Sequence, residues 1–216
     1  MSTSLETPAE FLDRTASAVH HLFVGIDAYM AILRNARPPA LVGSYQNEEE
    51  RNQALSQWMK QKADDIQKSL DSERAFLAQK IAFASLCGSV LQIAATGIRL
   101  YSTNATIPKS FSEVIKPESL AARYCVGREL RDVPLGLIVY AGRNQYNHLD
   151  DGELREPNST IFERLATRHN YGVGIRDPAF DLREDLVWNY ASNVTSLIGW
   201  RGYDAYEGDM RSMLGV

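Results

Sequence analysis

This chain has little cysteine, and the cysteines that it has form no disulfide framework. Cys87 and Cys125 are the only two in 216 residues, and Cys87 lies in an apolar stretch typical of a buried thiol. Two distant cysteines form no disulfide scaffold and match no zinc-ligand spacing. Residues 1–20 mix charged and polar groups and contain no apolar signal-peptide core. We therefore expect a cytoplasmic protein in a reducing compartment.

Excess charge and repeated sequence are also lacking. The formal net charge is only −4, so the whole molecule has no general attraction for nucleic acid. Any site for RNA or DNA must then depend on a local basic patch. The hydrophobic fraction of 44% is that of an ordinary globular protein, and no repeat or low-complexity linker is visible. This length and composition predict a single domain spanning residues 1–216.

One stretch lacks charge altogether. From Ile81 to Ile98 there is no charged residue, which is close to the shortest length that crosses a bilayer. The stretch nevertheless contains Ser85, Gln92 and Thr96 together with several alanines. Such polarity favours a helix buried in a protein core, and we expect no association with a membrane.

Helix signals fill the first half of the chain. Thr7-Pro8-Ala9-Glu10 combines a capping threonine, a proline at the first helical position and an acid at the third, and it predicts a helix start. Pro38-Pro39 predicts its end. The segment from about Glu48 to Tyr101 has no proline. It predicts two helices, or one long helix with a break near residue 71, where Asp71 or Ser72 would cap the second part.

The second half predicts further helices separated by loops. Asp132 and Pro134 open an element that runs to about Leu149, and Thr160 to Arg168 and Asp181 to Ile198 carry helical spacing. Residues 170–178 are expected to form a loop. The Gly/Tyr-rich tail after Trp200 is expected to be weakly ordered.

The segment 135–140 leaves two structures open. Its β-branched and aromatic residues suit a short buried strand, which would allow an α/β enzyme. Steps of three and four favour a helix instead, because they form a continuous apolar stripe. The members of that stripe are Leu135, Ile138, Gly142, Tyr146 and Leu149.

Polar residues gather at the end of this expected helix, in the run Arg143-Asn144-Gln145-Tyr146-Asn147-His148. On a helix, Asn144 and His148 are four apart and share a face, and Arg143 and Asn147 share the adjoining face. One cation, one titratable ring and two amides thus meet at a helix terminus. This cluster is the best candidate in the sequence for a working site.

The run resembles the signature of HEPN domains, in which an arginine, usually followed by a polar residue, precedes a histidine by four to six residues. Arg143, Asn144 and His148 match it, with four residues between arginine and histidine. The motif covers about six residues of the chain, and the all-helical layout agrees across most of the rest. HEPN domains are helical bundles that usually dimerise. Many are metal-independent endoribonucleases of toxin–antitoxin, abortive-infection and other defence systems.

This resemblance implies an all-α fold, an antiparallel helical bundle with a HEPN-like core over about residues 8–200 and a tail over about 200–216. It implies a homodimer that cleaves RNA without metal or cofactor, as a toxin or phage-defence effector with an antitoxin protein as partner. Some HEPN toxins carry a modifiable tyrosine two residues after the histidine. Asp150 stands there in this chain, which puts control by that route in doubt.

The chemistry expected of the site is cleavage of RNA by its own 2′-hydroxyl. Histidine suits proton transfer near neutral pH, and arginine matches the phosphate with a fixed charge. One histidine does not easily act as both acid and base, so two facing copies in a symmetric dimer are the economical arrangement. We assign catalysis to Arg143, Asn144 and His148. Substrate binding is assigned to Asn147, Tyr146, Arg128 and Arg131.

Other interpretations of the same residues remain open. Arg143 would pair with Asp150 or Asp151, and His148 would merely cap a helix terminus, in a purely structural arrangement. A second pair at the same spacing, Arg164 and His169, lacks the polar second position. The alternative function is a non-catalytic helical module that binds RNA or a protein through the same surface.

Overall fold

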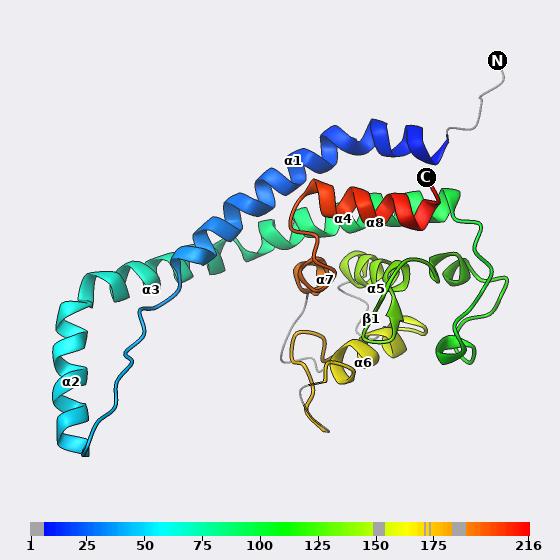
Figure 1. Ribbon diagram of the computed structural model, residues 1–216. Helices are drawn as coiled ribbons and strands as arrows, with labels where there is room; N and C mark the ends of the chain where they lie inside the picture. The colour runs from blue at the N-terminus through cyan, green and yellow to red at the C-terminus, as the bar shows by residue number, and fades with distance from the viewer. Residues whose placement is uncertain (1–6, 149–153, 171, 173, 183–188) are drawn as a thin grey trace. The chain divides into compact units, whose positions relative to one another are not determined.

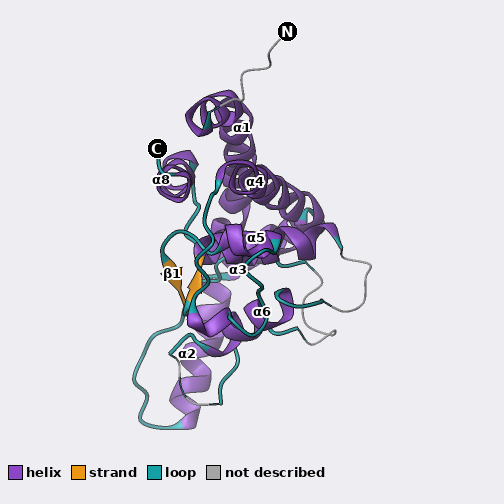
Figure 2. Cartoon of the chain, turned by 90° about the vertical axis from the view of Figure 1, so that its right-hand side faces the viewer, coloured by secondary structure: helices purple, strands orange, loops and turns teal. Residues whose placement is uncertain are grey.

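The computed structural model describes residues 7–148, 154–170, 172, 174–182 and 189–216. These residues form eight α-helices, two short 3₁₀ helices and one two-stranded hairpin. Figures 1 and 2 draw the chain from two sides. The helices are α1 (Pro8–Asn35), α2 (Glu48–Gln61), α3 (Ala63–Ala78), α4 (Lys80–Tyr101), α5 (Leu135–Asn147), α6 (Asn158–Thr167), α7 (Ala191–Leu197) and α8 (Tyr203–Leu214). The remaining elements are η1 (Lys109–Phe111), η2 (Leu120–Tyr124), β1 (Glu129–Leu130) and β2 (Val133–Pro134).

The predicted all-α class is confirmed, and the α/β alternative is wrong for the described residues. The segment 135–140 lies inside α5 and is helical. Strand structure among the described residues is limited to β1 and β2, two residues each, which pair in antiparallel register. Arg131 and Asp132 turn this hairpin with positive φ angles of 54° and 60°. The chain divides into two compact units, Met1–Gly25 with Phe83–Val216 and Ile26–Ala82, which we call unit 1 and unit 2.

The predicted start of α1 is confirmed atom by atom. The Thr7 backbone N–H and hydroxyl both donate to Glu10 Oε2, at 2.8 and 3.0 Å, and the Glu10 backbone N–H donates to Thr7 Oγ1 at 3.2 Å. This reciprocal arrangement is a capping box, which satisfies helix N-terminal donors that have no partner inside the helix. It also lowers the pKa of the Glu10 carboxyl, mainly through the hydrogen bond from the Thr7 backbone. The helix ends at Asn35, before the two prolines.

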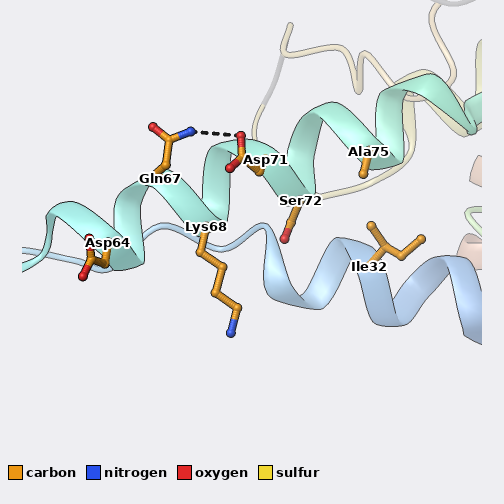
Figure 3. A pocket seen from close by; sticks show the side chains of 7 residues that line it. All are labelled: Ile32, Asp64, Gln67, Lys68, Asp71, Ser72 and Ala75. Atoms are coloured by element: carbon orange, nitrogen blue, oxygen red, sulfur yellow. Dashed lines mark hydrogen bonds between the residues drawn. The ribbon is translucent and has the colours of Figure 1, made fainter.

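The break expected near residue 71 is wrong. The helical segments separate instead at Lys62, with φ −106° and ψ 12°, and at Gln79, with φ −107° and ψ 6°. Asp71 lies inside α3, where its carboxylate accepts a hydrogen bond of 2.9 Å from Gln67 Nε2, drawn in Figure 3. An acid engaged with a side chain one turn earlier does not cap a helix start. Neither Lys62 nor Gln79 is a residue type that marks a break in the sequence.

Unit 2 buries little of its own surface. Helix α2 has no buried residue, and α3 buries only Ser69, whose hydroxyl donates to the Ala36 carbonyl at 2.6 Å. A shallow hollow lies between Ile32 of α1 and one face of α3 (Figure 3). Its α3 lining carries both charge signs, from Asp64, Lys68 and Asp71. Because Lys68 has acidic neighbours on both sides, the hollow presents no excess of positive or negative charge to a ligand.

Unit 1 is organised around α5. Helix α5 contacts α6, α7, η2 and β2, and it lies between α4 and α6 in both views (Figures 1 and 2). Helix α4 buries ten residues, which confirms the prediction of a core helix over 81–98. Cys87 among them is fully buried, as expected, and burial raises the pKa of its thiol to about 11.

Two glycines allow α4 and α5 to approach closely. A Cβ added to Gly88 of α4 would come within 2.6 Å of the Tyr146 ring of α5. A Cβ added to Gly142 of α5 would lie 3.1 Å from Leu91 of α4 and 3.0 Å from Val194 of α7. A side chain at Gly88 would force the Tyr146 ring to move, and one at Gly142 would press on Leu91 and Val194. The two helices therefore hold the polar end of α5 at a fixed place against α4.

Among the residues that the structure describes, two helices are long and apolar enough to cross a membrane by length and composition alone, Pro8–Arg34 and Lys80–Tyr101. In the second, 56% of the apolar window is buried inside the protein. Core helices and N-terminal signal sequences pass the same test. The expected cytoplasmic location therefore stays a prediction.

The expected helix over 181–198 is confirmed only for its last part, where α7 spans Ala191–Leu197. Asp181, Leu182, Asn189 and Tyr190 are not helical, and α7 begins only at Ala191; residues 183–188 lie outside the described part. The Tyr190 backbone N–H donates to the Gln145 side chain at 3.0 Å instead of to a helix carbonyl. The Tyr190 hydroxyl donates to the Asp181 carbonyl at 2.6 Å. These tertiary hydrogen bonds hold the chain in a non-helical course that periodicity does not reveal.

The expectation of a weakly ordered tail after Trp200 is also wrong. Residues 203–214 form α8, whose Tyr206, Met210 and Met213 are buried. The Tyr206 ring packs at 5.0 Å from the Trp200 ring, and Trp200 Nε1 donates to Asp209 Oδ2 at 2.9 Å. The aromatic residues that suggested a loose tail are thus the side chains that anchor it to unit 1.

Candidate functional site

The polar end of α5 is built around the Arg143 guanidinium. Its Nε donates to Gln92 Oε1 of α4 at 2.8 Å, and its Nη1 donates to Asn144 Oδ1 at 3.0 Å. Asn147 Nδ2 donates to the same Gln92 oxygen at 3.1 Å. The guanidinium is therefore held by amide oxygens on two sides, which fixes its plane without neutralising its charge.

A chain of amides extends this arrangement from α4 to α6. Asn144 Nδ2 makes a long hydrogen bond of 3.4 Å to Asn158 Oδ1 at the start of α6. Within the described part of the chain, Arg143 forms no ion pair with an acid, and its Nη2 has no hydrogen-bond partner. The pairing of Arg143 with Asp150 or Asp151 that the sequence left open falls outside the described residues. Of the expected cluster of one cation, one titratable ring and two amides, the structure brings together Arg143, Asn144 and Asn147 but not His148.

A pocket of about 150 Å³ opens beside this guanidinium, and we call it the Arg143 pocket. All of its walls belong to unit 1, from α4, η2 and α5. No acidic residue is among the lining residues that the structure describes. The lining consists of Gln92, Ala95, Thr96, Arg99, Leu120, Tyr124, Tyr140, Arg143 and Asn144.

The pocket is electropositive, as the effect of three arginines on the pKa of its lining residue Tyr124 indicates. Burial raises the pKa of the Tyr124 phenol to about 12, while the positive charges of Arg143, Arg99 and Arg123 act to lower that pKa. The Tyr124 hydroxyl donates to the Ala95 carbonyl at 2.8 Å, so this hydroxyl is engaged inside the protein. Three guanidinium charges acting on one buried ring, with no acid in the lining, make a site that favours an anion.

His148 lies elsewhere. It is the C-cap of α5, with φ −123° and ψ 41°, and its backbone N–H donates to the Asn144 carbonyl at 3.0 Å. Its side chain is exposed and is not part of the lining of the Arg143 pocket. Because α5 ends at Asn147, helix geometry no longer sets the direction of the His148 side chain. Within one protomer, the structure does not join His148 to the Arg143 pocket.

Tyr146, which was expected to bind substrate, packs inside unit 1. Its ring packs directly on Gly88 of α4, and the residue is half-buried. It does not line the Arg143 pocket. In this position Tyr146 fixes α5 against α4 and so supports the neighbouring Arg143–Gln92 contact.

The hairpin arginines are held inside unit 1. Arg128 Nε lies 2.9 Å from Asp209 Oδ1, which raises the pKa of the guanidinium, and Arg128 also donates to the Ile198 carbonyl. Arg131 lies 2.8 Å from Asp177 Oδ2, donates to the Leu165 carbonyl and stacks over a phenylalanine ring at 5.1 Å. Neither arginine lines the Arg143 pocket.

The rival pair Arg164 and His169 makes no comparable site. Arg164 Nη2 donates to the Ser110 carbonyl at 2.7 Å, and the guanidinium lies 4.9 Å from the Phe111 ring centroid. The His169 ring nitrogen lies 2.9 Å from the Ile175 carbonyl oxygen. Both side chains thus hold loops in place.

Several site residues were missed by sequence reasoning. Gln92, Arg99 and Asn158 come from other elements and lie far from the motif in the chain. Gln92 had a visible signal, because it is an amide within the charge-free stretch 81–98, and Arg99 directly follows that stretch. Nothing in the sequence indicates that these residues face α5.

Comparisons of the chain with protein-family models, with curated proteins and with solved structures found no match. Among the described residues, no group of three or more His, Cys, Asp or Glu side chains is placed to hold a metal ion. The function must therefore be inferred from the geometry of the Arg143 pocket and the residues around it.

Proposed function

We propose that this chain is a metal-independent endoribonuclease of the HEPN type, whose helices form an antiparallel HEPN-like bundle. In this proposal Arg143 and Asn144 bind an RNA phosphate, and His148 transfers protons. The observation that carries it is the Arg143 guanidinium, held by Gln92 and Asn144 beside a pocket lined by no described acid. The protein would act in the cytoplasm as a toxin or phage-defence effector restrained by an antitoxin protein.

The reaction needs no cofactor. The ribose 2′-oxygen attacks the adjacent phosphorus while the bond from phosphorus to the 5′-oxygen breaks. The proton of the 2′-hydroxyl goes to a base, and an acid supplies a proton to the leaving 5′-oxygen. The products are a 2′,3′-cyclic phosphate and a 5′-hydroxyl. Histidine suits the proton transfers because its ordinary pKa lies near neutral pH, and arginine stabilises the charge that develops on phosphorus.

The position of His148 makes this proposal depend on a second copy of the chain. Because His148 is outside the Arg143 pocket of its own protomer, the imidazole that serves one pocket must come from the partner of a homodimer. A two-fold axis near the C-terminus of α5 would supply this twice, once for each pocket.

A second function is favoured by the same observation. If no partner supplies an imidazole, the Arg143 pocket still presents unneutralised guanidinium groups to a polyanion. The chain would then be a non-catalytic module that binds RNA phosphates.

Two single variants and their mixture test the proposal. We expect His148→Ala to reduce RNA cleavage by about a hundredfold or more, because one proton-transfer group is lost. Arg143→Ala should reduce both cleavage and RNA binding. Mixing the two inactive variants should restore part of the activity, since one of the hybrid dimer's two sites keeps both residues. Arg201→Ala, an exposed arginine away from the pocket lining, is the matched control.

The outcomes separate the two functions. Wild-type protein that binds varied RNAs but leaves them intact, with no 2′,3′-cyclic phosphate ends, supports the binding module and overturns the ribonuclease. Activity that persists in His148→Ala also overturns the mechanism. Melting temperatures equal to wild type are required of each variant.

A further inference from the structure

The Arg143 pocket suits a phosphate monoester even better than the phosphodiester of an RNA chain. A phosphate group fits its volume of about 150 Å³, and the attached nucleosides lie outside it. A monoester also carries close to two negative charges near neutral pH, whereas a diester carries one.

Three donors that line the pocket are free to bind such a group. Arg143 has Nη2 unengaged by any described residue, and the Arg99 guanidinium likewise has no hydrogen bond or ion pair with the described part of the chain. Tyr140 also lines the pocket, and no described residue hydrogen-bonds to its hydroxyl. By contrast, the Thr96 hydroxyl donates to the Gln92 carbonyl at 2.8 Å and is already engaged.

The charges around the pocket favour the dianion. Arg123 adds a third cation, and its Nη1 donates to the Arg99 backbone carbonyl at 2.8 Å, which anchors it beside the pocket. All three guanidinium groups act on Tyr124, so their fields overlap at the base of the pocket. Cations gathered without a counter-ion repel one another, and a bound dianion relieves that repulsion.

We propose that the Arg143 pocket binds a phosphate monoester, with the phosphate between Arg99 and Arg143 and the Tyr140 hydroxyl as a third donor. The phosphate belongs either to a free nucleotide or to the phosphorylated end of an RNA strand. The inference goes beyond RNA cleavage and does not depend on His148 or on a second copy of the chain.

Calorimetric titration of the wild-type chain tests this with matched ligands. Adenosine monophosphate should bind, and adenosine, which lacks the phosphate, should not. A short single-stranded RNA with a 5′-phosphate should bind at least about fivefold more tightly than the same RNA with a 5′-hydroxyl if the pocket takes RNA ends. If only the mononucleotide shows the phosphate effect, the source is a free nucleotide.

Variants assign the effect to this pocket. Arg99→Gln should weaken the phosphate-dependent binding by about tenfold, and Tyr140→Phe by about threefold. Arg201→Gln should leave it unchanged. The inference is overturned if adenosine binds as tightly as adenosine monophosphate and RNA with a 5′-hydroxyl binds as tightly as RNA with a 5′-phosphate. Wild-type affinity in Arg99→Gln overturns it as well.

Discussion

Two groups of arginines in unit 1 have opposite surroundings. Arg128 and Arg131, at the β1–β2 hairpin, each face a carboxylate, Asp209 at 2.9 Å and Asp177 at 2.8 Å. Arg99 and Arg143, at the Arg143 pocket, face amides, tyrosines and an opening lined by no described acid. The first group stabilises the fold through ion pairs. The second keeps its charge available to a ligand.

This difference shows that the positive charge of an arginine does not by itself tell whether the residue stabilises the fold or binds a ligand. An ion pair cancels most of the field of both partners, whereas an unpaired cation in a recess projects its field onto whatever enters. Nothing in the sequence shows which of these four arginines face a carboxylate and which do not. Mutation should separate them, because loss of a paired arginine costs stability and loss of a pocket arginine costs binding.

The largest effect on stability is expected for Arg131→Met. Both Arg131 and Asp177 have side chains only 15% exposed, so the substitution leaves a nearly buried carboxylate without its partner. The free energy of unfolding should fall by about 3 kcal/mol. Urea denaturation followed by circular dichroism measures this.

A double-mutant cycle with Asp177→Asn provides the control. Because the two side chains act as one pair, the double variant should lose clearly less than the sum of the single losses. Strict additivity, or a loss under about 1 kcal/mol in Arg131→Met, would contradict the structural role of the pair.

A smaller loss, about 1 kcal/mol, is expected for Arg128→Met. The Arg128 side chain is 47% exposed, so water screens its pair with Asp209. Because Asp209 also accepts the Trp200 indole N–H, the substitution should change tryptophan fluorescence. The matched comparison is Arg143→Met, which should cost less stability, since the Gln92 oxygen still accepts from Asn147. A larger loss in Arg143→Met than in Arg128→Met would break the distinction between the two groups.

Local patterns predicted much of the helical structure of unit 1. The capping box at Thr7, the core helix over 81–98 and the helix after Pro134 all follow from short-range spacing, and all are present. The failures involve long-range contacts. The Tyr190 backbone N–H donates to the Gln145 side chain, and Trp200 packs on Tyr206 of α8. Periodicity carries no information about either partner.

The candidate site was predictable in part for the same reason. Arg143 and Asn147 are four apart on α5, so their shared face follows from helix geometry. Asn144 joins them because the Arg143 guanidinium donates to its side chain. Gln92, which orients Arg143, comes from α4, and Arg99 completes the pocket from one helix end. His148 was expected on the face of Asn144, but α5 ends at Asn147 and His148 leaves helical geometry as the C-cap.

The smallest effect is an alkaline one, and it tests whether burial beside the pocket arginines keeps the Tyr124 phenol neutral in the folded protein. The pKa of Tyr124 is raised to about 12 by burial, so the fold favours the neutral phenol. This contribution to stability is fully present below the ordinary tyrosine pKa of about 10 and is lost as pH rises from about 10 towards 12. By pH 10.5 the loss should be under about 1 kcal/mol. Tyr124→Phe should remove it from urea-denaturation profiles, while the alkaline loss that comes from Cys87, whose pKa is about 11, remains. Between about pH 10 and 11 the loss at Tyr124 comes almost wholly from ionisation of the unfolded chain, so Arg143→Met and Arg128→Met should both leave its size unchanged. A Tyr124→Phe variant that declines as steeply as the wild type would mean that burial beside the pocket does not hold the phenol neutral.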